Sequence, residues 1–227
     1  MRVLAIDTAL EACSAAVLDT SRGGITASET IAMVRGHAEA LMPLVARVMD
    51  IAAIEFAELD RIAVTTGPGS FTGLRVGISA GRGIALAAGK PAIGLSTLAA
   101  FAAPLIAEDD STHVVSAIDA RHDHVYLQVF GIGGRTLVAP RIATLRDAIR
   151  AAMTGPARIV GTAANMVAAA WPKSGDPPLS VEQRAAPHIG WIARLGAAAA
   201  DSHGPPKPLY LRAPDAQPQD AARLPRR

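Results

Sequence analysis

The chain has 227 residues, half of them hydrophobic, which is enough for one or two domains with a continuous core. Its net charge of +2 gives no sign of a nucleic-acid-binding protein. A single cysteine excludes an internal disulfide, and no run of about 18 apolar residues predicts a membrane span. The N-terminal residues lack the basic and apolar regions of a signal peptide, so we expect a cytoplasmic protein.

The first block of elements has three strands, followed by helices and strands in alternation. Short apolar runs bounded by turn residues predict the strands, and apolar residues three or four apart predict the helices. The expected strands are residues 2–8, 13–18, 25–33, 61–65 and 91–95, and the expected helices are residues 37–54, residues 72–88 and a short one from 97.

A second block begins at His113 and opens like the first. "VLAIDTA" at residues 3–9 and "VVSAIDAR" at residues 114–121 are both apolar strands that end in Ala-Ile-Asp before a turn. This similarity predicts an internal duplication and a two-lobed α/β or α+β fold with mixed sheets. The further expected strands are residues 113–119, 124–130, one after a turn at 131–134, and 157–160, and the expected helices are residues 145–153, 163–171 and 188–200.

Residues 64–90, "VTTGPGSFTGLRVGISAGRGIALAAGK", combine a helical pattern with many glycines. The spacing fits neither a P-loop nor a dinucleotide fingerprint. The segment at 67–70 does lead from a strand into a helix, where anions can bind. A tight turn with Ser70 or Thr72 as the helix N-cap is the favoured alternative.

The same segment contains two further patterns. "GISAG" matches the nucleophile elbow of serine hydrolases, but Ser79 falls in mid-helix rather than at a strand-to-helix turn. Gly73, Gly77 and Gly81 form a stripe on one side of the helix, each costing about 1 kcal/mol relative to alanine. We interpret the stripe as a close-packing surface, either within the chain or, as we favour, towards a partner.

Asp7 and Asp119 each end an expected strand. They could form a carboxylate pair for Mg²⁺ or acid–base chemistry, or they could cap turns, and both interpretations remain open. His122 and His124 provide too few ligands for a metal site and are expected on a surface hairpin. The proline-containing, basic C-terminal end is expected to be disordered.

Five segments together resemble the TsaB (YeaZ) family of tRNA N6-threonylcarbamoyladenosine biosynthesis. They are "LAIDT" at 4–8, "GHAEALMP" at 36–43, the glycine-rich block at 65–100, "AIDARHDHVY" at 117–126 and "KPLYLR" at 207–212. The resemblance implies an actin/Hsp70-like (ASKHA, RNase H-like) fold of two related lobes. The expected division is an N-terminal lobe at residues 1–108, a diverged second lobe at 109–213 and a disordered tail at 214–227.

The same resemblance implies a non-catalytic scaffold or dimerization subunit without a cofactor. Its expected partner is the transferase TsaD, with TsaE in a larger complex, tRNA bound indirectly or weakly, and a homodimer possible in isolation. TsaD carries two metal-binding histidines where this chain has Thr97 and Phe101. Neither of these residues is a suitable transition-metal ligand, so we expect no metal site and no catalytic residue here.

The resemblance also indicates two sets of site residues. The expected partner interface, on the first two helices of the first lobe, comprises His37, Glu39, Leu41, Met42, Val45, Met49, Gly73, Leu74, Gly77, Ile78 and Gly81. A vestigial phosphate-loop region comprises Asp7, Thr8, Gly67, Pro68, Gly69, Ser70 and Asp119.

The alternatives are enzymes that act by themselves. The first is an ASKHA-type phosphotransferase that binds Mg-nucleotide with Asp7, residues 67–70 and Asp119. The others are a serine hydrolase that uses Ser79 and a peptidase of the M22 type, which would need a metal.

Overall fold

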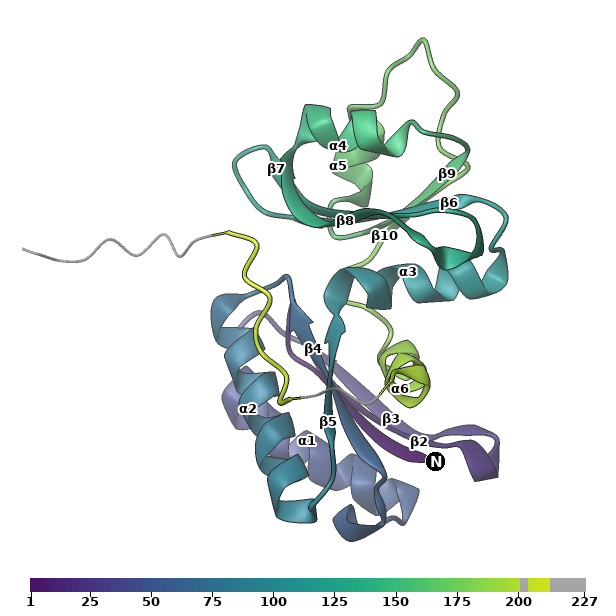
Figure 1. The fold of residues 1–227 in the computed structure, drawn as a ribbon. Helices are drawn as coiled ribbons and strands as arrows, with labels where there is room; N and C mark the ends of the chain where they lie inside the picture. Colours follow the sequence, from purple (N-terminus) through teal and green to yellow (C-terminus); the bar gives the residue numbers. More distant parts are fainter. Residues whose placement is uncertain (201–203, 213–227) are drawn as a thin grey trace, which may run out of the picture.

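Two five-stranded mixed sheets form the frame of the protein, and the computed structural model describes residues 1–200 and 204–212 (Figure 1). The first sheet contains β1 (Arg2–Asp7), β2 (Ala12–Asp19), β3 (Gly24–Ala32), β4 (Arg61–Gly67) and β5 (Ala92–Ser96). The second contains β6 (His113–Asp119), β7 (His124–Phe130), β8 (Thr136–Thr144), β9 (Ala157–Gly161) and β10 (Ser180–Gln183). The α-helices are α1 (His37–Ala52), α2 (Phe71–Ala88), α3 (Thr97–Glu108), α4 (Leu145–Ala152), α5 (Ala164–Ala169) and α6 (Ile189–Ala198). All these elements except β10 are predicted from the sequence.

The two sheets have the same topology. The first has the order β3-β2-β1-β4-β5 and the second the order β8-β7-β6-β9-β10. In each sheet the first three strands of the block are antiparallel, and the last two are parallel to the first. This repeat supports the predicted duplication and the predicted two-lobed α/β fold of the actin/Hsp70-like class.

The two Ala-Ile-Asp triplets, however, do not occupy equivalent positions in the two sheets. Ile6 packs with the residues of α1 and α2 on one face of the first sheet. Ile118 packs with α3, on the opposite face of the second sheet from α4 and α5. Because successive strand residues point to opposite faces, the two identical triplets are out of phase with the duplication.

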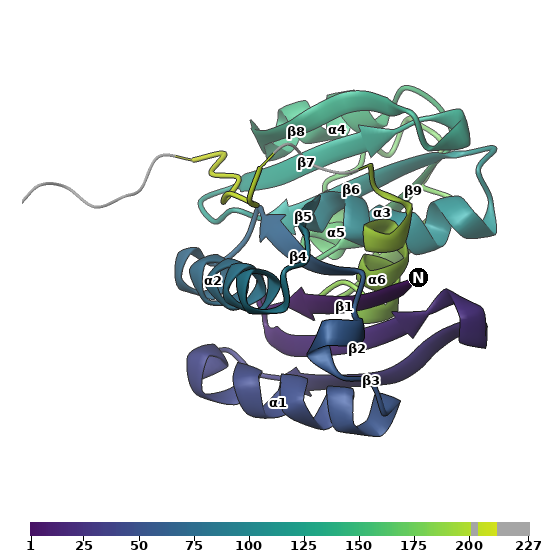
Figure 2. The same cartoon turned by 60° about the horizontal axis from the view of Figure 1, so that its bottom comes forward.

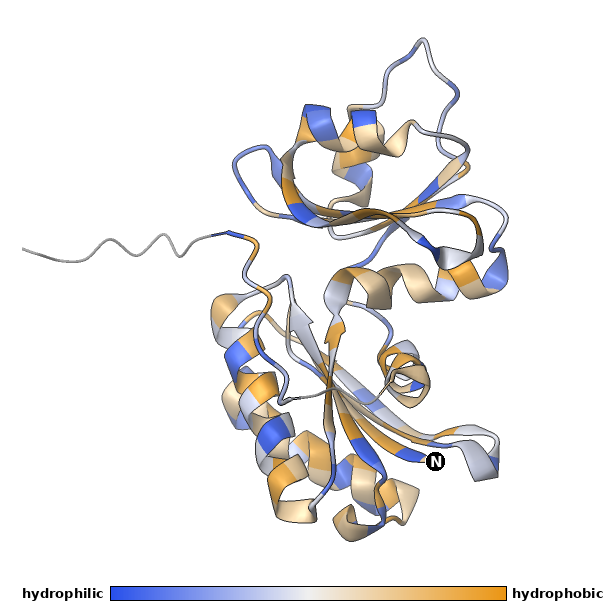
Figure 3. Cartoon of the chain, viewed as in Figure 1, coloured by the Kyte–Doolittle hydropathy of each residue, from blue (hydrophilic) through white to orange (hydrophobic). Residues whose placement is uncertain are grey.

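Each lobe has an outer pair of helices and an inner helix that comes from the other block. Helices α1 and α2 cover the outer face of the first sheet, and α4 and α5 cover that of the second (Figures 1 and 2). The last helix of the first block, α3, packs on the inner face of the second sheet, whereas α6 packs on the inner face of the first. Figure 3 colours α3 in the apolar range along most of its length, as expected for a helix covered on several sides.

Helix α6 is held to the first sheet by close packing and by one arginine. A Cβ atom on Gly196 would lie 2.4 Å from Cβ of Ala63, so the helix approaches β4 as closely as a glycine permits. Arg61 donates hydrogen bonds to the carbonyl oxygens of Gly196 (3.1 Å) and Ala199 (2.7 Å), at the C-terminal end of α6. A cation is favourable there because these carbonyls lack partners within the helix.

The predicted second lobe at 109–213 is therefore wrong at its C-terminal end. Helix α6 and residues 204–212 pack on the first lobe, because the inner face of that sheet and the ends of β4 and β5 would otherwise be uncovered. The predicted tail at 214–227 lies outside the described residues. No helix in the described ranges is long and apolar enough to cross a membrane.

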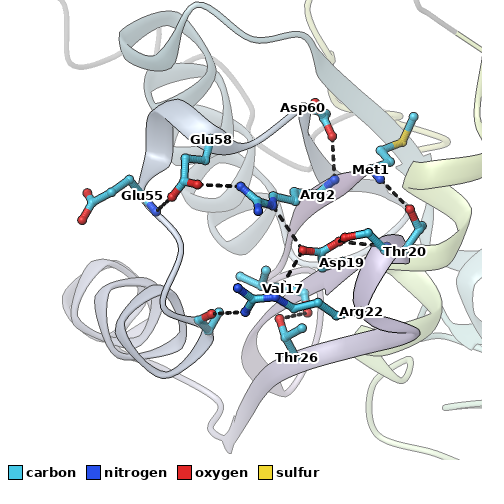
Figure 4. A network of polar contacts seen from close by, with 12 residues as sticks. Met1, Arg2, Val17, Asp19, Thr20, Arg22, Thr26, Glu55, Glu58 and Asp60 are labelled. Atoms are coloured by element: carbon cyan, nitrogen blue, oxygen red, sulfur yellow. Dashed lines mark hydrogen bonds and ion pairs between the residues drawn. The ribbon is translucent and has the colours of Figure 1, made fainter.

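A polar network lies at the end of the first sheet where β1 begins (Figure 4). The guanidinium of Arg2 contacts the carboxylates of Asp19 (3.1 Å) and Glu58 (2.6 Å), and its backbone N–H donates to Asp60. Asp19 also accepts hydrogen bonds from the backbone N–H and the hydroxyl of Ser21. The network joins β1, the β2–β3 turn and the segment before β4.

Candidate functional site

The loop between β4 and α2 packs directly against the turn that follows β1. The backbone N–H of Ser70 donates to the carbonyl of Ala9 (2.7 Å), and a Cβ atom on Gly69 would lie 2.3 Å from the same oxygen. Ser70 is the N-cap of α2, as the turn interpretation predicts, and its hydroxyl accepts from the N–H of Gly73. Two of the amide groups that could bind an anion at this helix start are therefore already used.

Asp7 faces the protein interior. Its Oδ1 atom accepts hydrogen bonds from the hydroxyl of Thr65 (2.5 Å) and the backbone N–H of Ala9 (3.1 Å), while Oδ2 is buried without a partner. Burial raises the pKa of this carboxyl, and its two hydrogen bonds oppose the shift. The side chain is completely buried, so it cannot contact a ligand without a rearrangement.

Asp119 lies in the other lobe and is exposed at the end of β6. Its carboxylate accepts from the backbone N–H of Arg121 (2.7 Å), and this bond caps the β6–β7 turn. The structure brings Asp7, Thr8, Gly67, Gly69 and Ser70 together, but Asp119 is on the second sheet and caps a turn there. In residues 1–200 and 204–212, no three His, Cys, Asp or Glu side chains form a group that could hold a metal.

The glycine stripe of α2 is packed against its own sheet. A Cβ atom would lie 2.1 Å from the carbonyl oxygen of Thr8 at Gly73, and 2.4 Å from the Thr8 hydroxyl at Gly77. At Gly81 it would lie 3.4 Å from Cβ of Val64. The Thr8 hydroxyl also donates to the carbonyl of Gly73 (2.7 Å). The prediction that this stripe receives a partner's helix is therefore wrong, because Thr8 in the turn after β1 and strand β4 already occupy it.

Most other residues of the predicted partner interface also face inwards. The buried ones fill the space between the first sheet and its outer helices: His37, Leu41, Val45, Met49, Leu74 and Ile78. The Nε2 atom of His37 lies 3.0 Å from the carbonyl oxygen of Leu10, to which it donates. Only Glu39 and Met42 of the predicted set are exposed. Apolar spacing predicts the buried face of a helix. Most of the residues predicted to contact a partner lie on that buried face.

The apolar side chains that are exposed on α1 and α2 share only Met42 with the predicted interface, and the two helices contact each other on the same face of the sheet. We call this set, Met42, Ile51, Phe71 and Leu86, the α1–α2 surface. Leu86 is 85% exposed, the largest exposed fraction of the four. Met42, Ile51 and Leu86 lie between the buried residues of a helical pattern and away from the core face, and this position in the sequence predicts their exposure.

The start of α2 carries an aromatic cluster that includes the C-terminal segment. The rings of Phe71 and Tyr210 stack with centroids 5.5 Å apart, and the Arg75 guanidinium lies 3.8 Å from the centroid of Phe71. Arg75 also donates to the hydroxyl of Tyr210 (3.2 Å). The sequence gives no sign of the contact between Arg75 and Tyr210, which are 135 residues apart.

Known proteins similar to this chain identify its family. The family model described as "TsaD: tRNA N6-adenosine threonylcarbamoyltransferase" matches residues 14–184. The chain is 40% identical over 126 residues to the "tRNA threonylcarbamoyladenosine biosynthesis protein TsaB" of Escherichia coli (strain K12). The aligned residues are 56% of this chain and 53% of that protein. Among solved structures, "YeaZ from Pseudomonas aeruginosa" has a TM-score of 0.78 at 29% identity and covers 92% of this chain and 99% of that one. The chain belongs to the TsaD family, in its TsaB/YeaZ branch.

The similarity within the TsaB/YeaZ branch is uneven along the chain. The alignment spans about half the length of the curated TsaB proteins that it matches. An uncharacterized protein of Mycobacterium tuberculosis (strain ATCC 25618 / H37Rv) is 33% identical over 216 residues, which is 95% of this chain and 94% of that protein. The YeaZ structure likewise extends the similarity in fold to nearly the whole chain.

In this TsaB/YeaZ chain, two residues of α3 occupy the positions at which the resemblance to TsaD implies metal-binding histidines. Thr97 and Phe101 are both buried in α3, and Phe101 packs in the apolar cluster with Val114 and Val160 of the second sheet. Ser79, the residue of the hydrolase alternative, is exposed within α2 and far from its N-terminus. The surroundings of Thr97 and Phe101 do not fit a metal site, and those of Ser79 do not fit a nucleophile elbow.

The histidines of the β6–β7 turn follow the surface-hairpin prediction. Arg121, His122 and Asp123 have left-handed backbone conformations with φ of 63°, 52° and 57°. The Nδ1 atom of His124 lies 2.6 Å from the carbonyl oxygen of His122 and donates to it, so this nitrogen is already used within the turn.

Proposed function

We propose that this protein acts in tRNA threonylcarbamoyladenosine biosynthesis as a non-catalytic subunit that binds a TsaD-type transferase through the α1–α2 surface. The observation that carries the proposal is the exposure of four apolar side chains on these two helices, Met42, Ile51, Phe71 and Leu86. Exposed apolar and aromatic side chains of this kind are typical of the centres of protein–protein contacts. The names of the TsaB relatives supply the pathway.

The non-catalytic role is supported by the residues that a catalytic role would need. Asp7 is buried and hydrogen-bonded inside the first lobe, and the loop at 67–70 is packed on the neighbouring turn. Thr97 and Phe101 offer no transition-metal ligand. The protein would therefore act by binding, stabilising a competent conformation of the transferase and contributing to the surface for TsaE, with tRNA contacted weakly or indirectly.

Reconstitution tests the proposal. The purified chain is mixed with the TsaD, TsaE and threonylcarbamoyl-adenylate synthase of its own organism, and modified adenosine in tRNA is measured with and without it. We expect co-elution with TsaD and modification only when both are present. Modification by this chain without TsaD, or tight binding of Mg-ATP to this chain alone, would contradict the non-catalytic assignment.

A single substitution tests the surface itself. Leu86→Asp places a charge at the most exposed apolar position of α2, where burial against a partner would leave it unpaired. We expect at least a tenfold weaker affinity for TsaD, about 1.4 kcal/mol or more, measured by calorimetry. Ile132→Asp changes another exposed apolar position, on the second lobe, and is the control that should leave binding unchanged.

The same surface offers a contact for self-association. When TsaD is absent, we expect two copies to pair through α1 and α2, with a concentration-dependent mass in sedimentation experiments. Leu86→Asp should then weaken the homodimer together with the heterodimer. If the variant bound TsaD normally, the interface would have to lie elsewhere, whereas the assigned pathway would still stand.

A further inference from the structure

Residues 204–212 lie across the ends of two strands of the first sheet. The backbone N–H of Leu209 donates to the carbonyl of Thr66 (2.8 Å). Thr66 is the extra residue of a β-bulge, since Thr65 pairs with Leu95 while Gly67 pairs with Ser96. A bulge leaves a residue out of the regular ladder, and here the C-terminal segment satisfies its carbonyl.

Small residues make room for this segment. A Cβ atom on Gly94 would lie 3.0 Å from Cβ of Pro206, which is buried. A Cβ atom on Gly67 would lie 3.1 Å from the carbonyl oxygen of Leu209, and Gly67 itself has a φ of 113°. The segment is therefore fitted to β4 and β5 over at least four residues. Tyr210 adds the stacking contact with Phe71 and the hydrogen bond from Arg75 on α2.

The segment then reaches the second lobe. Arg212 donates a hydrogen bond to the carbonyl of Ala120 (3.2 Å), at the start of the β6–β7 turn. The next three residues of that turn have left-handed conformations, which are unfavourable for residues with a side chain and depend on support from their surroundings. In Figure 1 the yellow segment runs beside β5 and α2 towards the level where the two lobes meet.

The lobes are also joined elsewhere, since Leu10 of the first lobe packs against the apolar cluster formed by α3 and the second sheet. Within the described residues the chain passes between the sheets twice, from α3 into β6 and from β10 to α6. The inner helices α3 and α6, each of which adjoins one of these passages, contact each other. Rotation about two such crossings is a common form of hinge motion in two-lobed proteins. A third contact, away from those crossings, would restrict it.

We propose that residues 204–212 form a strap that fixes the angle between the lobes and thereby sets the position of the β6–β7 turn relative to α2. Leu209 and Tyr210 anchor the strap on the first lobe, and Arg212 attaches it to the second. Release of the strap allows the lobes to rotate. The strap shares Phe71 with the α1–α2 surface, but its effect on the lobe angle can be tested on the isolated chain without the proposed partner.

Spin labels measure the angle directly. Cysteines are introduced at two exposed positions, Ser79 on α2 and Arg146 on α4, in a Cys13→Ala background, and the distance distribution is measured by electron paramagnetic resonance. The labelled chain is diluted with unlabelled chain so that distances between copies do not contribute, and we expect one narrow distribution in the parent chain. It should become broader, or gain a second population, in Leu209→Pro, which lacks the donor to Thr66, and in Arg212→Ala.

Amide hydrogen exchange gives a second measurement. Arg212→Ala should speed the exchange of residues 120–124 about tenfold relative to the remainder of the second lobe. Lys207→Ala changes an exposed side chain on the same segment and is the matched control, expected to behave like the parent. Circular dichroism checks that each variant is folded. Should Leu209→Pro fail to fold, Arg212→Ala decides alone. Unchanged distances and unchanged exchange in folded Arg212→Ala would overturn the proposal.

Discussion

Two buried aspartates of the first sheet have pKa values that are shifted in opposite directions. Burial raises the pKa of Asp7, and hydrogen bonds from Thr65 and Ala9 only partly oppose the shift. The hydroxyl of Ser21 lowers the pKa of Asp19 to about 2, assisted by the backbone N–H of Ser21 and by Arg2 and opposed by burial. Asp7 therefore favours folding more as the pH falls through its raised pKa, whereas Asp19 favours folding only while it is ionised.

The Asp19 network predicts a defined pH dependence. Its folded pKa of about 2 lies below the ordinary value of 3.8, so its contribution is complete above about pH 4 and is lost as the pH falls towards 2. Asp19→Asn removes the charge and the ion pair with Arg2. We expect the variant to be less stable than the parent at pH 6, with the difference shrinking towards pH 2.

Urea unfolding between pH 2 and pH 6 measures this difference. Asp50→Asn alters an exposed carboxylate on α1 and serves as control, with little change expected. A difference between Asp19→Asn and the parent that stays constant across the whole range would show that the ionised carboxylate does not stabilise the fold.

Single residues of the candidate site were partly predictable. The N-cap of α2 and the surface position of His122 follow from local rules about caps and turns. The burial of Asp7 does not, because a strand-ending aspartate is compatible with a turn cap and with a ligand-binding site. Its environment depends on Thr65, which is 58 residues away.

Among the elements, α2 gives the clearest relation between sequence and packing. Its glycines cost helix stability, and the structure shows what offsets the cost, because the turn after β1 approaches the helix more closely than any side chain would allow. The pattern predicts close packing correctly. It does not indicate the packing partner, since a sheet and a second helix both require small residues.

Substitution of two glycines in this helix separates the packing effect from helix propensity. Gly73→Ala would bring Cβ to 2.1 Å from a backbone oxygen of Thr8, so the strand–helix contact must open. We expect destabilisation of about 1–3 kcal/mol. Gly83→Ala meets open space on the same helix and should stabilise by about 0.5–1 kcal/mol. Thermal unfolding compares the two, and equal effects would contradict the packing explanation.

Strand β10 is the element that the sequence does not reveal. It has four residues, Ser180–Gln183, with only one apolar member, and it follows a proline-containing segment. Its strand conformation is determined by pairing with β9 at the edge of the second sheet. The longer elements are recognisable because their own apolar pattern is sufficient, whereas a short polar edge strand depends on its neighbour.

At the scale of the whole molecule, the duplication is correctly predicted but the exchange of inner helices is not. The apolar faces of α3 and α6 predict burial without indicating which sheet covers them. The expected boundary at residue 108 follows from the resemblance to the TsaB (YeaZ) family. The structure requires residues from the end of the chain to complete the first lobe.

Truncation tests this dependence. A chain of residues 1–112 retains the first sheet with α1, α2 and α3 but lacks α6, so Val3, Ala5 and Ala63 would lose their cover. We expect no cooperative thermal transition, and strong binding of a hydrophobic dye. A chain of residues 1–212 retains α6 and should melt like the full-length protein. A cooperative transition of the shorter chain near that temperature would contradict the prediction.

The exchanged helices also determine the order in which the protein can be completed on the ribosome. The covering helix of the second sheet, α3, is synthesised before any strand of that sheet, whereas α6, which covers the first sheet, emerges only after nearly two hundred residues. The first lobe is therefore synthesised first, but its fold is completed last. Its inner surface stays uncovered until α6 has been synthesised, and during that interval a nascent chain of this protein has the greatest need of a chaperone.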